Sequence, residues 1–293
     1  MGGFNKNFKD GRGGLKGGAN NASSGFQSSE AKSSDDAGGS SNSEPPIAFW
    51  DMEEDGSGTT ATDRSAAGNN LNLTIRDVGG GALPTWDSGT KARGSYSLKI
   101  AGTRDQAHIA DNNLLDFAAD DTFSVSFFVR NISSGSPSGW GYINKMANSS
   151  PYRGWGVENT SPGKIDFFVV ETWASSALGL RTAAAHMNNT TDWHHIVATY
   201  DGSADSAGVV VYFDGTAHTI ANGGIVNYIT DTLNTDDTTV NATDLTLGSR
   251  ATGHHAQIYL DDVAIFDYVL TADQVTSIYN SGASLDVSDG IPT

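Results

Sequence analysis

The chain has 293 residues, a formal net charge of −17 and no cysteine. The negative charge disfavours nucleic acid and anionic lipid as partners, and without cysteine there is no disulfide framework, thiol nucleophile or cysteine-based zinc site. Glycine is abundant, proline is scarce, and polar residues separate short apolar runs. This composition is typical of many short strands joined by polar turns, and one β-sandwich of ~200–250 residues plus an extension fits the length.

A glycine- and serine-rich arm, residues 1–46, precedes the first strongly apolar run and ends at Pro45-Pro46. Alone, such a segment cannot bury enough apolar surface to fold, and the simplest interpretation is a disordered tail. We predict instead that the arm docks on a neighbouring subunit through three apolar anchors, Phe4, Phe8 and Leu15. No apolar stretch follows its basic residues, so we expect no signal peptide, and no segment approaches the ~20 apolar residues of a membrane span.

After the arm, apolar and polar residues alternate in a series of short segments separated by turn residues. The pattern predicts antiparallel strands near 47–50, 71–75, 96–100, 123–129, 165–170, 245–248 and 258–266. Longer polar loops are expected around 133–160 and 219–244. One short helix is predicted at 271–281, because Thr271 and Gln274 are spaced as a capping box and Gly282 can end the helix.

The clearest structural prediction is a hairpin at 192–215, D-W-H-H-I-V-A-T-Y-D-G-S-A-D-S-A-G-V-V-V-Y-F-D-G. Its two runs are rich in β-branched and aromatic residues, and a polar turn joins them. The closing Asp214-Gly215 is itself a strong turn signal between extended segments. Because an isolated strand pair is barely stable in water, this hairpin must belong to a larger sheet.

Four stretches, in this order, resemble the laminin G-like or concanavalin A-like lectin family. They are F-W-D-M-E-E-D-G-S-G, F-S-V-S-F-F-V-R, the hairpin with its D-W-H-H motif, and I-Y-L-D-D-V-A-I-F. The resemblance covers about residues 47–282 and leaves 283–293 as a tail. It implies an all-β fold, a two-sheet antiparallel jelly-roll sandwich with one short helix near the C-terminus and an extended N-terminal arm. The fold does not by itself define a function.

Acidic residues cluster directly after the first predicted strand, in Asp51-x-Glu53-x-Asp55-Gly56. Oxygen ligands of this kind suit calcium, although the spacing is not that of an EF-hand. The family resemblance implies a structural calcium held by Asp51 or Glu53, by the backbone carbonyl of Ser95 or its neighbour, and by Asp261. The alternative is that these carboxylates are solvated or cap turns.

Catalysis is not expected. Related sandwich glucanases carry a Glu-x-Asp-x-x-Glu strand, and Asp166 with Glu171 does not match it. The pair His194-His195 lies within the family's Trp-His-His motif, where we expect packing and hydrogen bonding. The pair in the polar turn at 254–255 could bind a transition metal, but such histidines are more often solvated.

The sequence favours ligand binding over catalysis. Aromatic residues crowd the glycine-rich region around 140–155, and a glycan platform is predicted from four of them, Trp140, Tyr142, Tyr152 and Trp155. Packing of the same rings over the sandwich or against a partner is an equal alternative. We predict a non-enzymatic structural protein of a phage virion, a capsid decoration or tail-fibre component on the virion surface; the alternative is a bacterial surface adhesin or carbohydrate-binding module.

Overall fold

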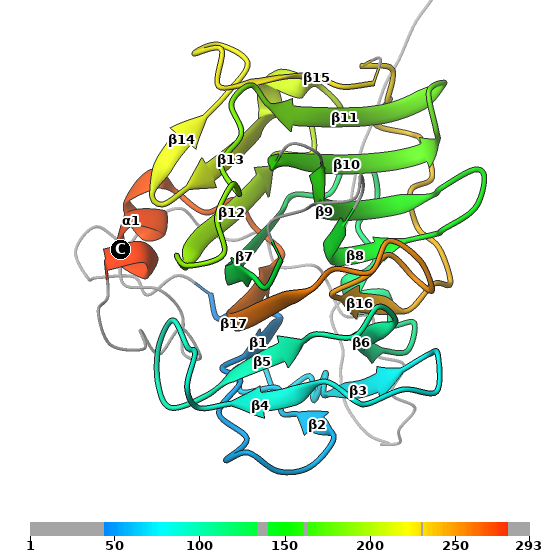
Figure 1. The fold of residues 1–293 in the computed structure, drawn as a ribbon. Helices are drawn as coiled ribbons and strands as arrows, with labels where there is room; N and C mark the ends of the chain where they lie inside the picture. Colours follow the sequence, from blue (N-terminus) through cyan, green and yellow to red (C-terminus); the bar gives the residue numbers. More distant parts are fainter. Residues whose placement is uncertain (1–43, 134–139, 161–162, 230, 281–293) are drawn as a thin grey trace, which may run out of the picture. The chain divides into compact units, whose positions relative to one another are not determined.

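The computed structural model describes residues 44–133, 140–160, 163–229 and 231–280, which belong to one unit of the chain, Ser40–Thr293. They form two antiparallel sheets, which confirms the predicted sandwich class (Figure 1). Sheet A has the order β14 (Thr216–His218), β13 (Val209–Phe213), β12 (His194–Tyr200), β7 (Phe123–Asn131), β17 (Ile258–Phe266), β5 (Ser97–Ile100) and β4 (Thr85–Asp87), with β1 (Ala48–Trp50) also paired to β17. Sheet B has the order β15 (Ile225–Asn227), β11 (Ser176–Thr182), β10 (Lys164–Thr172), β9 (Gly154–Thr160), β8 (Trp140–Met146), β16 (Leu245–Leu247), β6 (Asp105–Ile109), β3 (Leu73–Asp77) and β2 (Thr60–Ala61). Two short 3-10 turns, Asn113–Leu115 and Ser206–Gly208, lie in the connections.

The predicted hairpin is present in sheet A. Strands β12 and β13 pair in a register that runs from Ile196 opposite Phe213 to Tyr200 opposite Val209. Strand β13 continues into β14 through Asp214 (φ 49°) and Gly215 (φ 76°), the positive dihedrals of a tight hairpin turn. Strand β7 pairs with the other side of β12, so the hairpin is part of a larger sheet, as the low stability of an isolated strand pair requires.

The prediction of a polar loop around 133–160 is wrong at two strands, β8 and β9, which together cover half of that range. These strands pair antiparallel with each other in sheet B. Every residue of both strands is buried, so no polar face alternates with an apolar one in their sequences. A strand covered on both faces loses the period-two signal, and their glycines and asparagines lower the apparent strand propensity further.

The main core lies between the two sheets and is built around large side chains from both. Phe123 of β7 stacks on Phe117, with ring centroids 4.4 Å apart, and also contacts Trp155 of β9 at 5.3 Å. Phe167 of β10 and Tyr200 of β12 complete this aromatic group. These rings come from strands far apart in the sequence, so the core depends on sheet order rather than on local pattern.

Helix α1 (Ala272–Asn280) packs on the side of sheet A that faces away from the main core. Val275 and Ile278 belong to one hydrophobic cluster with apolar side chains of β1, β7, β12, β13 and β17. The predicted capping box is confirmed: the Thr271 backbone N–H donates to the Gln274 side chain at 2.8 Å, and the Gln274 N–H donates to the Thr271 hydroxyl at 3.2 Å. Over the described ranges, no helix has the length and apolar character needed to cross a membrane.

Candidate functional site: an aromatic cleft and an acidic cluster

Three of the four aromatic residues predicted to form a glycan platform lie in the core. Trp140 and Tyr142 on β8 and Trp155 on β9 are 4%, 0% and 1% exposed. The Trp155 indole donates to the Leu115 carbonyl at 2.9 Å. A buried ring cannot stack on a sugar, so the platform prediction is wrong for these three; packing, the alternative, holds. The error follows directly from reading β8 and β9 as loops.

Tyr152, the fourth residue, lines a cleft of about 540 Å³ with Asn148, Trp173, Arg250 and His254. We refer to these five residues as the aromatic cleft. Tyr152 and Trp173 are half-buried and meet edge to face, with ring centroids 5.8 Å apart. The Trp173 backbone N–H donates to the Pro151 carbonyl at 3.0 Å, which ties the turn after β10 to the connection between β8 and β9. The two rings are therefore held in a fixed arrangement.

Further aromatic packing supports Trp173 from the outer face of sheet B. Phe168 of β10 lies 5.2 Å from Trp173 between ring centroids, and Tyr228 lies 6.5 Å away. Residues 167 and 169 belong to the main core, whereas Phe168 belongs to a separate outer cluster with Met146, Val170 and Ala177. The alternation of a regular strand thus places an apolar base under the cleft on the side away from the core.

Buried charges lie beside the cleft. Arg250 is 6% exposed; its Nη1 is 3.3 Å from the Glu158 carboxylate and its Nη2 is 2.6 Å from Nε2 of His254. Burial raises the pKa of Glu158 to about 7, against the opposing effect of Arg250. Asp166 lies directly opposite Glu158 on β10, and Arg181 of β11 binds it with two contacts of 2.6 and 2.7 Å. Four charged groups therefore form two neighbouring ion pairs on sheet B.

Sequence reasoning missed most of this site. The sequence patterns assign no role to Asn148, Glu158, Trp173 or Arg250, and they favour a solvated His254. The cleft combines the β8–β9 connection, the turn after β10 and the turn after β16. No local motif marks the proximity of three such distant segments. Only a correct assignment of β8 and β9 could have brought them together.

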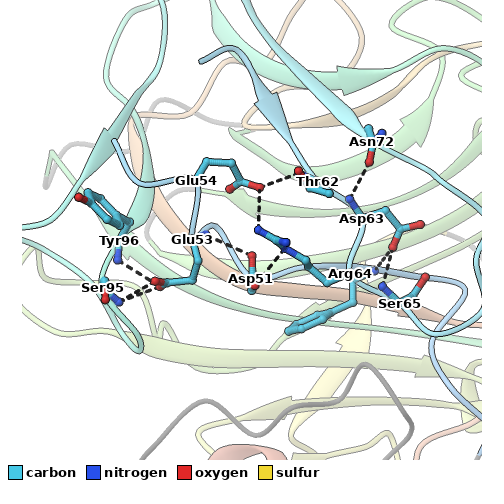
Figure 2. A network of polar contacts seen from close by, with 11 residues as sticks. Asp51, Glu53, Glu54, Thr62, Asp63, Arg64, Ser65, Asn72, Ser95 and Tyr96 are labelled. Carbon is cyan, nitrogen blue, oxygen red and sulfur yellow. Dashed lines mark hydrogen bonds and ion pairs between the residues drawn. The ribbon is translucent and has the colours of Figure 1, made fainter. Parts of the chain in front are cut away.

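The predicted calcium residues lie in a second site, which we call the acidic cluster: Asp51, Glu53, Asp261 and Asp262. Figure 2 shows the first part of it, where the Glu53 carboxylate points at the loop before β5 and accepts from the N–H groups of Ser95 at 2.8 Å and Tyr96 at 3.1 Å. Asp51 accepts from the Glu53 N–H at 3.2 Å and pairs with Arg64 at 3.4 Å. The turn-capping role considered for these acids is thus present.

Asp261 is fully buried at the start of a bulge in β17. Its Oδ2 accepts from the N–H groups of Ala92 at 2.9 Å and Arg93 at 3.0 Å, and its Oδ1 accepts from the Asp262 N–H at 3.0 Å. Burial raises the pKa of Asp261 well above its ordinary range, and the neighbouring Asp262 and Glu53 raise it further.

This donor set does not fit calcium as it is arranged. Calcium takes six to eight oxygen ligands at 2.3–2.6 Å around one point. Here the carboxylate oxygens of Glu53 and Asp261 are occupied by backbone N–H groups, and nowhere in the described ranges do three or more acidic or histidine side chains converge to hold a metal ion. Calcium binding stays a prediction from the family resemblance, and it would require these side chains to rearrange.

The histidines in the Trp-His-His motif have the packing role expected of them. His195 is fully buried, its Nε2 lies 2.9 Å from the Ser126 hydroxyl, and its ring stacks on Phe128. His194 Nδ1 lies 2.9 Å from the Asp214 carboxylate. The predicted arm anchors Phe4, Phe8 and Leu15, and the tail 283–293, lie outside the described residues.

A family model described as concanavalin A-like lectin/glucanases superfamily matches residues 101–276, more than half of the chain. The chain belongs to this superfamily. The match confirms the resemblance drawn from the sequence motifs, and it spans β6 to β17 and the first half of α1. Among curated proteins, none matches the sequence.

Solved structures of similar fold include toxin binding domains. The binding domain of Paraclostridial Mosquitocidal Protein 1 is 17% identical with a TM-score of 0.58, and the match covers 81% of this chain and 52% of that one. The binding domain of botulinum neurotoxin DC, in complex with rat synaptotagmin II, is 15% identical with a TM-score of 0.55 over 81% and 52%. The botulinum neurotoxin serotype D ligand binding domain, in complex with N-acetylneuraminic acid, is 13% identical with a TM-score of 0.53 over 80% and 50%. At these identities the likeness concerns the fold, and this superfamily member spans about half the length of those structures.

Proposed function

We propose that this domain binds a carbohydrate in the aromatic cleft. The observation that carries the proposal is the pair of half-buried rings, Tyr152 and Trp173, fixed edge to face at the wall of a cleft of about 540 Å³. An aromatic face stacks on the apolar face of a sugar ring, and the side-chain amide of Asn148 can hydrogen-bond its hydroxyls.

Two further observations support binding rather than hydrolysis. Glu158 and Asp166 are adjacent carboxylates near the cleft, but they are 2% and 0% exposed and each is paired with an arginine. A general acid or nucleophile must reach the glycosidic bond. Fold relatives are named for binding: the botulinum neurotoxin serotype D domain is in complex with N-acetylneuraminic acid, and cell entry of botulinum neurotoxin type C is described as dependent upon interaction with two ganglioside molecules. These names favour a cell-surface glycan as the ligand class.

The setting that we propose is the surface of a phage virion, with the domain carried outward and residues 1–46 as its anchor. The glycine- and serine-rich composition of that segment and its few apolar side chains support this role. A bacterial surface adhesin with the same cleft is the alternative. The two settings share the glycan-binding activity and differ in what the arm contacts.

The test of the binding activity is a glycan array with purified wild-type protein, the Trp173→Ala variant and the Tyr259→Ala variant as control. Tyr259 is a half-buried aromatic residue of β17 in sheet A, where it contacts Trp193. We expect Trp173→Ala to weaken binding to the recognised glycan by about tenfold or more, the equivalent of ~1.4 kcal/mol, and the control to bind as wild type. Equal binding by all three proteins would exclude the aromatic cleft as the site.

A further inference from the structure

Arg93 lies beside the acidic cluster, where the family resemblance places a calcium ion. It is 8% exposed, and its Nη1 lies 3.3 Å from the Asp262 carboxylate. Its guanidinium also stands over the Phe128 ring, 4.2 Å from the centroid. An arginine this deeply buried needs an opposite charge and hydrogen-bond acceptors, and Asp262 of the acidic cluster supplies the charge and one acceptor.

The bulge in β17 brings two successive carboxylates to this arginine. The pairing register between β17 and β7 shifts between Asp261 and Ala264, and Asp262 has a φ of 42°. In a regular strand, neighbouring side chains point to opposite faces; a bulge redirects one of them. Asp261 therefore receives the backbone N–H of Arg93, while Asp262 receives its side chain.

The loop before β5 completes the compensation of negative charge. Its N–H groups bind two carboxylates: those of Ala92 and Arg93 donate to Asp261, and those of Ser95 and Tyr96 donate to Glu53. Gly94 lies between these two pairs with a φ of +55°. A Cβ at this position would stand 2.0 Å from Glu53 Oε1, so the carboxylate occupies the space that a side chain would need.

Arg93 also connects the acidic cluster to helix α1. Its Nη2 donates to the carbonyl of Ile278 and, at 3.3 Å, to the carbonyl of Tyr279. The last carbonyls of a helix lack partners within the helix and carry its partial negative charge, so a buried cation there is favourable. One guanidinium thus joins the loop before β5, the bulge of β17 and the C-terminal turn of α1.

From these contacts we infer that Arg93 acts as an internal cation in place of calcium, and that this member of the superfamily folds and holds α1 independently of the metal. The inference goes beyond glycan binding and does not depend on it. A fixed guanidinium supplies one positive charge and directional donors, whereas calcium would need the carboxylate oxygens that the backbone now occupies. The Arg93 side chain thereby supplies the positive charge that a bound structural ion would otherwise supply.

The first test uses the full wild-type chain and needs no variant. Thermal melting is followed in excess EDTA and in excess calcium chloride, and calcium is titrated into the EDTA-treated protein by calorimetry. We expect the same melting temperature in both solutions and no saturable heat of binding. A melting temperature several degrees higher in calcium, together with a saturable titration, would overturn the inference and support the structural calcium predicted from the resemblance.

The second test compares Arg93→Met with Arg153→Met. Both remove a guanidinium and keep an unbranched side chain, but Arg153 is about one-third exposed and lies 3.8 Å from Glu171. Breaking a buried pair should lower the melting temperature by about 10 °C, and Arg153→Met should stay close to wild type. Amide hydrogen exchange of α1 should quicken only in Arg93→Met. If Arg93→Met does not fold, Arg93→Lys is measured in its place. Because lysine retains the charge, we expect a smaller decrease in the melting temperature. Melting and exchange equal to those of the control would refute the inference.

Discussion

Replacing Tyr142 with phenylalanine separates its role in the core from the ligand-binding role that the sequence suggested. The Tyr142 hydroxyl donates to Asn131 Oδ1 at 3.0 Å and accepts from Asn159 Nδ2 at 2.7 Å, and all three residues are buried. Burial raises the pKa of this tyrosine, so the hydroxyl stays protonated and serves both asparagines. The variant removes a single oxygen atom and leaves the ring in place.

The expected cost follows from those two hydrogen bonds. A buried polar group that loses its hydrogen-bond partner lowers the free energy of unfolding by about 1–3 kcal/mol. The change to phenylalanine removes the partner of two side-chain amides, those of Asn131 and Asn159. Because neither asparagine can turn to water from the interior, we expect the free energy of unfolding to fall by about 2–4 kcal/mol. That is a large share of the ~5–15 kcal/mol that stabilises a typical domain.

Urea unfolding followed by fluorescence measures this change, and an unchanged m-value would show that the native state is affected rather than the extent of unfolding. The glycan array, run below the unfolding transition, should show wild-type binding. The opposite result, stability within about 0.5 kcal/mol of wild type with binding lost, would refute the placement of Tyr142 in the core.

Two other predictions concern protonation and the arm. Burial lowers the pKa of His195 from 6.5 to about 3, so as the pH falls the unfolded chain takes up a proton on this imidazole before the folded chain does. The contribution of the neutral, buried imidazole to the free energy of unfolding is therefore complete above pH 6.5 and is lost as the pH falls towards 3. Urea unfolding across this range should therefore show a shallower acid loss in His195→Gln than in wild type; parallel curves would contradict the assignment. The pKa of Glu158 is raised from 4.5 to about 7, so its contribution to stability is present at low pH and is lost as the pH rises through 7. Because wild type and His195→Gln both contain Glu158, this opposite effect cancels in the comparison. Deletion of residues 1–44 should abolish assembly, measured by light scattering, and leave a folded domain; assembly that survives the deletion would remove the proposed anchor.

Features encoded by neighbouring residues could be predicted from the sequence. The capping box of α1 needs only Thr271 and Gln274, and the β12–β13 hairpin needs only its alternating runs and its turn. Both signals arise within one turn or one strand pair, so they survive without knowledge of the rest of the chain. The order of four such motifs along the chain also predicted the superfamily, and the family match confirms that prediction.

The tertiary structure alone decided which polar and aromatic residues are functional candidates. Trp155 and Trp173 are both tryptophans near polar turns, yet the first is 1% exposed in the core and the second lines the aromatic cleft. Arg93 looks like an ordinary loop arginine until the β17 bulge brings Asp262 to it across 169 residues. Burial and long-range charge pairing depend on sheet order and register, and neither property is carried by a local stretch of sequence.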